Sequence, residues 1–82
     1  MFETCECIGI EVRHTKDFNT KQPKDVYYFH GKILDKPALD GVLTFSAKIP
    51  DHLLCRFEVG KNYLIAYSTY NGYRTIQEVF LK

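Results

Sequence analysis

Apolar and polar residues alternate along most of the chain, a pattern that predicts β-strands. The clearest alternation runs over Gly41–Ile49, where every second residue is apolar. We expect one set of side chains to face a core and the other to face outward, because successive residues of a strand point to opposite faces. The first set is Leu43, Phe45, Ala47 and Ile49, and the second is Thr44, Ser46 and Lys48.

Two earlier segments have the same period. Between Cys7 and Arg13 the apolar residues alternate with small or polar ones, as in a half-buried strand; they are Ile8, Ile10 and Val12. The segment Val26–Leu34 is rich in aromatic and β-branched residues, which favour strands. One side of it carries Tyr27, Phe29 and Ile33, and we expect the other side to face outward with Tyr28, His30 and Lys32.

The C-terminal part predicts two further strands, Asn62–Thr69 and Arg74–Leu81. They flank Tyr70–Tyr73, and the Asn-Gly pair at its centre is the strongest short-range signal for a hairpin. Tyr63, Ile65 and Tyr67 share a face, so we expect at least one of these tyrosines to be mostly buried. Before these strands, Leu53, Leu54 and Phe57 fall at helical spacing after Pro50 and Asp51, which predicts one or two helical turns.

Two segments without a period predict loops. His14–Asp25 is polar and contains Asn19 and Pro23, so we expect a long loop there. Asp35–Gly41 contains Pro37 and predicts a turn or wing. Gly9 and Gly31 lie inside predicted strands, where sharply coiled barrels place a bulge or a kink.

These elements predict an all-β fold with a short helix between the third and fourth of five strands, in a single domain of residues 1–82. That order matches the oligonucleotide-binding (OB) barrel. An SH3-like five-stranded barrel is the alternative, and the helix after the third strand and the long first loop favour the OB-like arrangement. Closing the sheet would also remove edge strands that so short a chain could not otherwise cover.

Size and composition indicate a small globular protein. Chains of this length bury only about 60% of their unfolded surface, so the core is thin. No apolar run approaches the ~20 residues of a membrane span, and the acidic N-terminus lacks the pattern of a secretory signal. We therefore expect a cytoplasmic protein without a membrane partner.

The three cysteines fit a reducing compartment, since a disulfide framework normally has an even number. Cys5 and Cys7 lie two apart and would share a face of a strand. On paper, Cys5, Cys7 and Cys55 with one of His14, His30 or His52 could supply four metal ligands. Ordinary reduced cysteines are the favoured interpretation, so we expect no metal site.

Motifs for catalysis are missing from the sequence. Tyr67–Thr69 has no Gly-x-Ser-x-Gly around its serine, the glycines form no phosphate-binding loop, and no pair of carboxylates is singled out by spacing. We therefore expect neither an enzyme nor a cofactor.

Charge and aromatic residues favour a binding protein. The formal net charge of +1 conceals a basic segment, residues 13–24, which has four cations against one acid, Asp17. OB barrels bind single strands on the outer faces of strands two and three and with their first and last hairpin loops. The predicted nucleic-acid-binding residues on these parts are Lys16, Phe18, Lys21, Lys24, Tyr28, His30, Lys32, Lys48, Tyr70, Tyr73 and Arg74. Of these, Tyr28 would offer a stacking plane, and Lys32 and Lys48 would lie near the phosphates.

Other interpretations of the same residues remain open. Tyrosine is common in sheets for packing alone, and lysines in a long loop can be merely solvated. Exposed Tyr and Arg are also what protein interfaces select, so a small protein-interaction barrel without a nucleic-acid role is the alternative function. A dimer that buries its aromatic patch between two copies is a third.

The layout resembles the gene V type of single-stranded-DNA-binding proteins of filamentous phages and mobile elements. The segments that carry the resemblance are Lys21–Tyr28, Asp35–Gly41 and Val59–Tyr63, which correspond to a basic loop with a Pro-aromatic end, a wing, and the entry to the fourth strand. Gln22 stands where that family commonly has Gly. The resemblance implies an OB-like homodimer that coats single-stranded DNA during replication or transfer in a bacterial host cell. The residues leave RNA open as the alternative ligand, and in a phage the alternative function would be that of a phage-encoded adaptor or inhibitor of a host protein.

Overall fold

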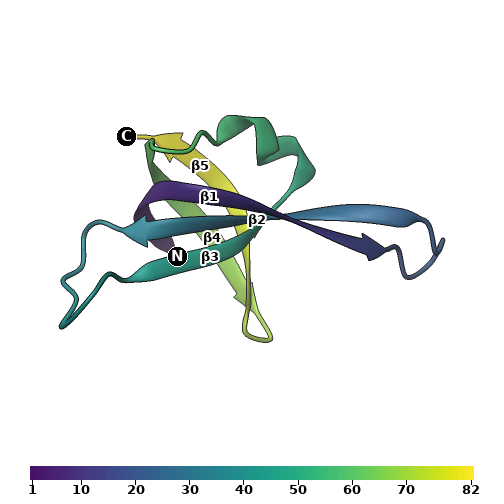
Figure 1. Ribbon diagram of the computed structural model, residues 1–82, viewed down its shortest axis with the longest axis horizontal. Helices are drawn as coiled ribbons and strands as arrows, with labels where there is room; N and C mark the ends of the chain where they lie inside the picture. Colours follow the sequence, from purple (N-terminus) through teal and green to yellow (C-terminus); the bar gives the residue numbers. More distant parts are fainter.

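The computed structural model describes residues 1–82 and contains five strands and one short helix in the expected order (Figure 1). The elements are β1 (Phe2–Lys16), β2 (Pro23–Ile33), β3 (Thr44–Ile49), the 3-10 helix η1 (Asp51–Arg56), β4 (Asn62–Tyr70) and β5 (Tyr73–Leu81). The all-β prediction is confirmed, as is a short helix between the third and fourth strands. No helix here is long and apolar enough to cross a membrane.

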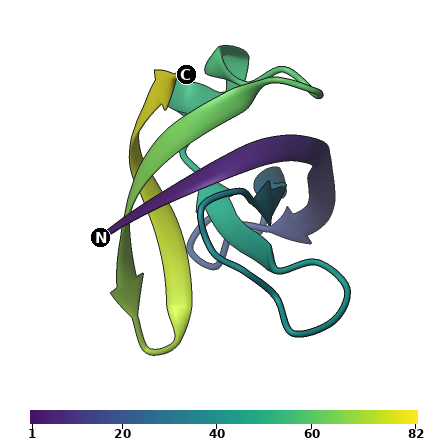
Figure 2. The same cartoon turned by 90° about the vertical axis from the view of Figure 1, so that its left-hand side faces the viewer.

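The five strands form one sheet that closes into a ring in the order β1-β2-β3-β5-β4. Neighbouring strands are antiparallel except β3 and β5, which meet in parallel at Lys48 and Thr75. β1 completes the ring by pairing its first residues with β4, from Phe2↔Ala66 to Glu6↔Asn62. Three segments extend from the ring: the end of the β1–β2 hairpin, the loop between β2 and β3, and the β4–β5 hairpin (Figures 1 and 2).

Eleven buried residues fill the ring, contributed by all five strands and by η1. Phe29 lies among them, with its ring 5.1 Å from that of Phe57 and 6.3 Å from that of Phe45. A Cβ atom on Gly31 would lie 2.5 Å from the Phe29 ring, so this glycine is needed for close packing. Tyr63 is buried, which confirms that at least one tyrosine of its face belongs to the core.

β1 changes face at a bulge between Cys7 and Gly9. Cys5 and Cys7 point into the core before it, and burial raises the pKa of both thiols, that of Cys5 to about 12. The strand is present, but the expectation that Ile8, Ile10 and Val12 form its buried side is wrong for two of the three residues. Ile8 lies at the bulge and is exposed, and Val12 is exposed because this part of β1 has left the ring, so only Ile10 packs against the core.

The predicted loop His14–Asp25 is wrong. β1 and β2 stay paired out to Lys16↔Pro23, so this segment is a two-stranded ribbon with a short turn at its end, here called the arm. The arm projects well away from the ring and gives the molecule a length of 44 Å against widths of 25 and 21 Å (Figure 1). Both faces of the arm meet solvent, so the alternation that marks a strand packed on a core is missing from its sequence.

Asp17 orders the tip of the arm. Its Oδ1 accepts hydrogen bonds from the backbone N–H groups of Asn19 (2.8 Å) and Thr20 (3.2 Å), and its own N–H donates to the Gln22 carbonyl. These bonds lower the pKa of the Asp17 carboxyl below its usual value. The tip therefore has a defined conformation, in which Lys21 has φ 58°.

The expectation that Leu43 faces the core is also wrong. β3 begins at Thr44, three residues after the predicted start at Gly41, and Leu43 is exposed at the end of the β2–β3 loop, residues 34–43, here called the wing loop. One side-chain contact ties this loop to the ring: Lys36 Nζ lies 2.7 Å from Oε1 of the buried Glu3. The remaining inward residues of β3, Phe45, Ala47 and Ile49, are buried as predicted.

Candidate nucleic-acid interface

An open pocket of about 540 Å³ lies on the outside of the ring, where β2 and β3 meet the β4–β5 hairpin. Two tyrosines and three cations line it, and we call it the groove. Its lining residues are Arg13, Tyr28, Ser46, Ala47, Lys48, Gly72, Tyr73, Arg74 and Thr75. Four of them were predicted from the sequence as nucleic-acid-binding residues: Tyr28, Lys48, Tyr73 and Arg74.

Strand register places one wall of the groove. Tyr28 on β2 lies directly opposite Lys48 on β3, so these outward side chains are cross-strand neighbours. The inward neighbours of Lys48, Ala47 and Ile49, are held in the core. A slip of one residue would turn Lys48 inward, so the packing of β3 fixes the position of its amino group.

The β4–β5 hairpin supplies the other wall. Asn71 and Gly72 both have positive φ, 49° and 80°, as the tightest hairpin turns require, and Tyr70 and Tyr73 pair across the turn. The parallel contact between Lys48 and Thr75 brings the start of β5 against β3. Consequently Tyr73 and Arg74 border the groove, and the Arg74 guanidinium lies 5.3 Å from the centre of the Phe45 ring.

Arg13 is a groove residue that the sequence analysis missed. Its guanidinium lies 4.0 Å from the centre of the Tyr28 ring, a distance typical of a cation–π contact. The β1 bulge makes this possible, since it places Glu11 opposite Tyr28 and Arg13 opposite Val26, on the face that carries Tyr28. The pairing could have been found only by knowing where β1 shifts register.

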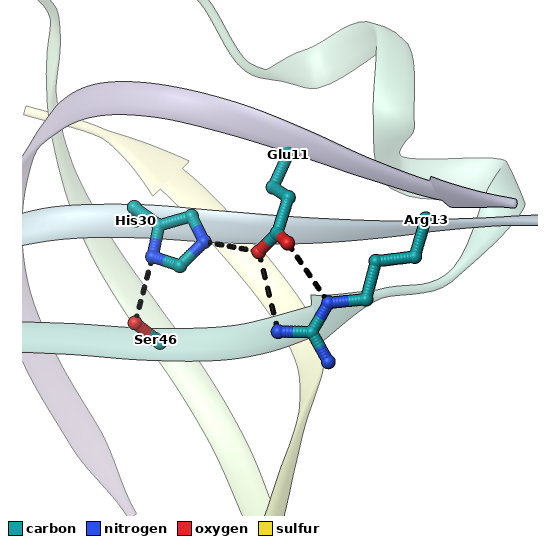
Figure 3. A network of polar contacts seen from close by, with 4 residues as sticks. All are labelled: Glu11, Arg13, His30 and Ser46. Carbon is teal, nitrogen blue, oxygen red and sulfur yellow. Dashed lines mark hydrogen bonds and ion pairs between the residues drawn. The ribbon is translucent and has the colours of Figure 1, made fainter.

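Beside the groove, four side chains form a hydrogen-bonded chain across β1, β2 and β3 (Figure 3). Glu11 Oε2 accepts from Arg13 Nε at 2.9 Å, and Oε1 lies 3.3 Å from Arg13 Nη2 and 2.7 Å from His30 Nε2. The other ring nitrogen of His30, Nδ1, lies 2.9 Å from Ser46 Oγ. Hydrogen bonds from Arg13 and His30 lower the pKa of Glu11 to about 2, so its carboxylate is ionised at neutral pH.

Some cations of the groove and arm form an ion pair with a carboxylate, and others do not. The ion pairs join Arg13 to Glu11, His14 to Asp25, His30 to Glu11, Lys36 to Glu3 and Arg56 to Glu78. None of them includes Lys48 or Arg74, nor the lysines of the arm. No carboxylate of the protein therefore neutralises Lys48 or Arg74, although the Arg74 guanidinium also lies on the ring of the core residue Phe45.

The remaining predicted binding residues lie outside the groove. Lys16, Phe18 and Lys21 surround a separate hollow at the tip of the arm, so they do not close one side of the site as the long-loop interpretation suggested. Lys24 lines a smaller pocket that it shares with Lys48, and Lys32 lies in a pocket beneath the wing loop. Tyr70 is exposed on the hairpin but does not line the groove.

Potential metal ligands are not gathered anywhere in the protein, and its three cysteines are free, with Cys55 exposed. No protein-family model, curated protein or solved structure matches the chain, so inferences about its function rest on its own geometry. The groove combines flat rings with unpaired cations and is open to solvent along one side.

Proposed function

We propose that this protein is a non-catalytic, OB-like module that binds single-stranded nucleic acid, DNA in the first instance, largely without regard to sequence. The observation that carries the proposal is the groove, where Tyr28, Lys48, Tyr73 and Arg74 come together from three separate strands.

The topology of the ring supports an OB-like interpretation over an SH3-like one. The helix η1 lies between β3 and β4, and the groove occupies the outer face of β2 and β3 together with the β4–β5 hairpin. These are the parts of an OB barrel that bind oligonucleotides. The site therefore lies where that fold would use it.

The chemistry of the groove suits a single strand. Tyrosine rings offer planes on which unpaired bases can stack, at about 1–3 kcal/mol per base, and every base has such a face. Lys48 and Arg74 can pair with phosphates, which carry no sequence information. Binding of this kind discriminates single from double strands but reads sequence weakly.

The resemblance to the gene V type extends this proposal to a biological role. On that basis the protein would act as a homodimer in the cytoplasm of a bacterial host cell and support replication or transfer of phage or mobile-element DNA. The support lies in the layout: an arm, a wing loop and an open groove on one small ring.

Fluorescence anisotropy with labelled oligo-dT tests the proposal. Each phosphate neutralised on a single strand contributes about −0.7 to the slope of log affinity against log salt, so the two groove cations without an ion pair, Lys48 and Arg74, predict a slope of about −1.4. A salt-independent affinity, or no binding at micromolar protein and low salt, would contradict the proposal.

Two variants of equal charge locate the site. Arg74→Gln should weaken binding and reduce the salt slope by about 0.7. Lys61→Gln removes the same charge from a position outside the groove and has no ion pair to lose, so it should leave both quantities nearly unchanged. Equal effects would mean that net charge, and not the groove, governs binding.

A protein-interaction module is the second candidate, favoured by the wing loop. Leu39 is fully exposed there and Val42 is largely exposed, while its one lysine is engaged by Glu3. A pull-down from cell lysate, with and without nuclease, separates the two functions. Partners that survive nuclease treatment and are lost on changing Leu39 to Asp favour this second function.

A further inference from the structure

Glu11 is an unexpected group beside a site for a polyanion. It is ionised at neutral pH and lies on the outward face of β1, directly opposite Tyr28. Electrostatics alone would give such a carboxylate a repulsive effect on phosphate. The contacts of Glu11 point to a different role.

Both oxygens of Glu11 hold neighbouring side chains in place. The carboxylate takes Arg13 through Nε and Nη2, a two-point contact that fixes the plane of the guanidinium as well as its position. His30 donates to the same carboxylate from β2 and is itself in contact with Ser46 on β3. Glu11 is therefore anchored directly by β2, and through His30 by β3, while it holds Arg13.

Arg13 is held with one edge, Nε and Nη2, towards Glu11. Its Nη1 amino group takes no part in that contact. Arg13 lines the groove, whereas Glu11 and His30 do not. Figure 3 shows the Arg13 side chain turned back along β1 towards the carboxylate.

We infer that Glu11 is a positioning residue, which holds the Arg13 guanidinium over Tyr28 as a preformed contact for the phosphate and base of a bound single strand. The inference rests on the proposed function. Fixing a long side chain before the ligand arrives lowers the entropy cost of binding, which is about 0.5–1.5 kcal/mol per side chain. Glu11 thus raises the affinity for a polyanion although it carries a negative charge.

Glu11→Gln and Glu6→Gln should have different effects on the affinity for oligo-dT. Glu6 lies on the same outer face, opposite Lys32, and removing its charge should leave the affinity for oligo-dT unchanged or raise it. Glu11→Gln removes the same charge but should weaken binding about two- to tenfold, because the two-point grip on Arg13 is lost.

A double-mutant cycle identifies Arg13 as the route of the effect. In an Arg13→Gln background the Glu11→Gln change should have no further effect on affinity. Thermal melts of each variant establish that the protein remains folded, and Arg13→Gln alone should reproduce the loss if Glu11→Gln impairs folding.

Three results would overturn the inference. Glu11→Gln could tighten binding as Glu6→Gln does, which would make Glu11 a competing anion. Its effect could persist without Arg13, which would make it structural. Wild-type protein that binds no oligo-dT would overturn the proposed function as well, whereas the first two results would leave that function intact.

Discussion

The two basic and aromatic hairpins of this protein have similar compositions and different surroundings. The arm carries Phe18 and three lysines, and the β4–β5 hairpin carries Tyr70, Tyr73 and Arg74. The β4–β5 hairpin is joined to β3 at the start of β5, so Tyr73 and Arg74 lie on the same groove as Tyr28 and Lys48. The arm leaves the ring, and the residues at its tip border only one another.

Strand pairing explains the difference. β5 contacts β3 through the parallel pairing at Lys48 and Thr75, which brings the start of β5 beside β3. β1 pairs with β4 only up to Glu6, and β2 pairs with β3 only from Tyr27 on, so no other strand holds the arm against the ring. The cations and aromatic rings of a hairpin therefore form a site only where pairing with a further strand, as of β5 with β3, places other cations and rings beside them.

The largest expected effect separates the ring from the arm. Phe29→Ala removes a fully buried ring and should cost about 3–5 kcal/mol of unfolding free energy. Phe18→Ala changes a side chain that is 98% exposed and should change that free energy by less than about 0.5 kcal/mol. Urea denaturation measures both, and a large loss for Phe18→Ala would mean that the tip of the arm packs against the ring.

Tyr73→Ala should have the next largest effect, on binding. If its ring stacks on a base, affinity for a short oligo-dT should fall by about 1–3 kcal/mol with little change in melting temperature. Phe18→Ala is the matched control, since an oligonucleotide that fills only the groove does not reach the tip of the arm. Equal losses for the two variants would show that the hairpins bind alike.

Changes at the two turns should affect stability less, and differently in the two hairpins. Gly72 has φ 80°, so Gly72→Ala should destabilise the protein by about 1 kcal/mol although its Cβ would meet no other atom. Lys21 has φ 58° at the tip of the arm, so Lys21→Gly should relieve strain and have a neutral or slightly stabilising effect. Thermal melts compare the two changes, and destabilisation by Lys21→Gly would contradict this account of the tip.

The smallest effect is a pH dependence confined to the arm. Since the pKa of Asp17 is lowered in the folded protein, the stabilisation from its two backbone hydrogen bonds is complete above the ordinary carboxyl pKa and is lost as the pH falls through the lowered value. The amide signals of Asn19 and Thr20 should shift in NMR spectra below about pH 4. The Asn71–Gly72 turn should not respond, and Asp17→Asn should abolish the response of the tip.

Local signals in the sequence predicted much of the ring. Alternation marked the buried side of β3, the Asn-Gly pair marked the β4–β5 turn, and helical spacing marked η1, with Leu53 buried as its core residue. These signals work because each depends on a few adjacent residues and on one buried face. Where a strand has no buried face, as in the arm, the pattern is absent and a ribbon looks like a loop.

The sequence predicted the groove only in part, because assembly depends on register. Tyr28 and Lys48 followed from alternation, and Tyr73 and Arg74 followed from the hairpin. The contact between Arg13 and Tyr28 did not, because a one-residue bulge between Cys7 and Gly9 sets which residues of β2 lie opposite this part of β1.

An NMR titration of the labelled protein with a short oligo-dT tests most directly whether the groove is the nucleic-acid site. Chemical shifts of Tyr28, Lys48 and Tyr73 should change on binding, while those of Lys61 and the wing loop should stay in place. Shifts confined to the wing loop or to the tip of the arm, or no shifts at all, would contradict the assignment.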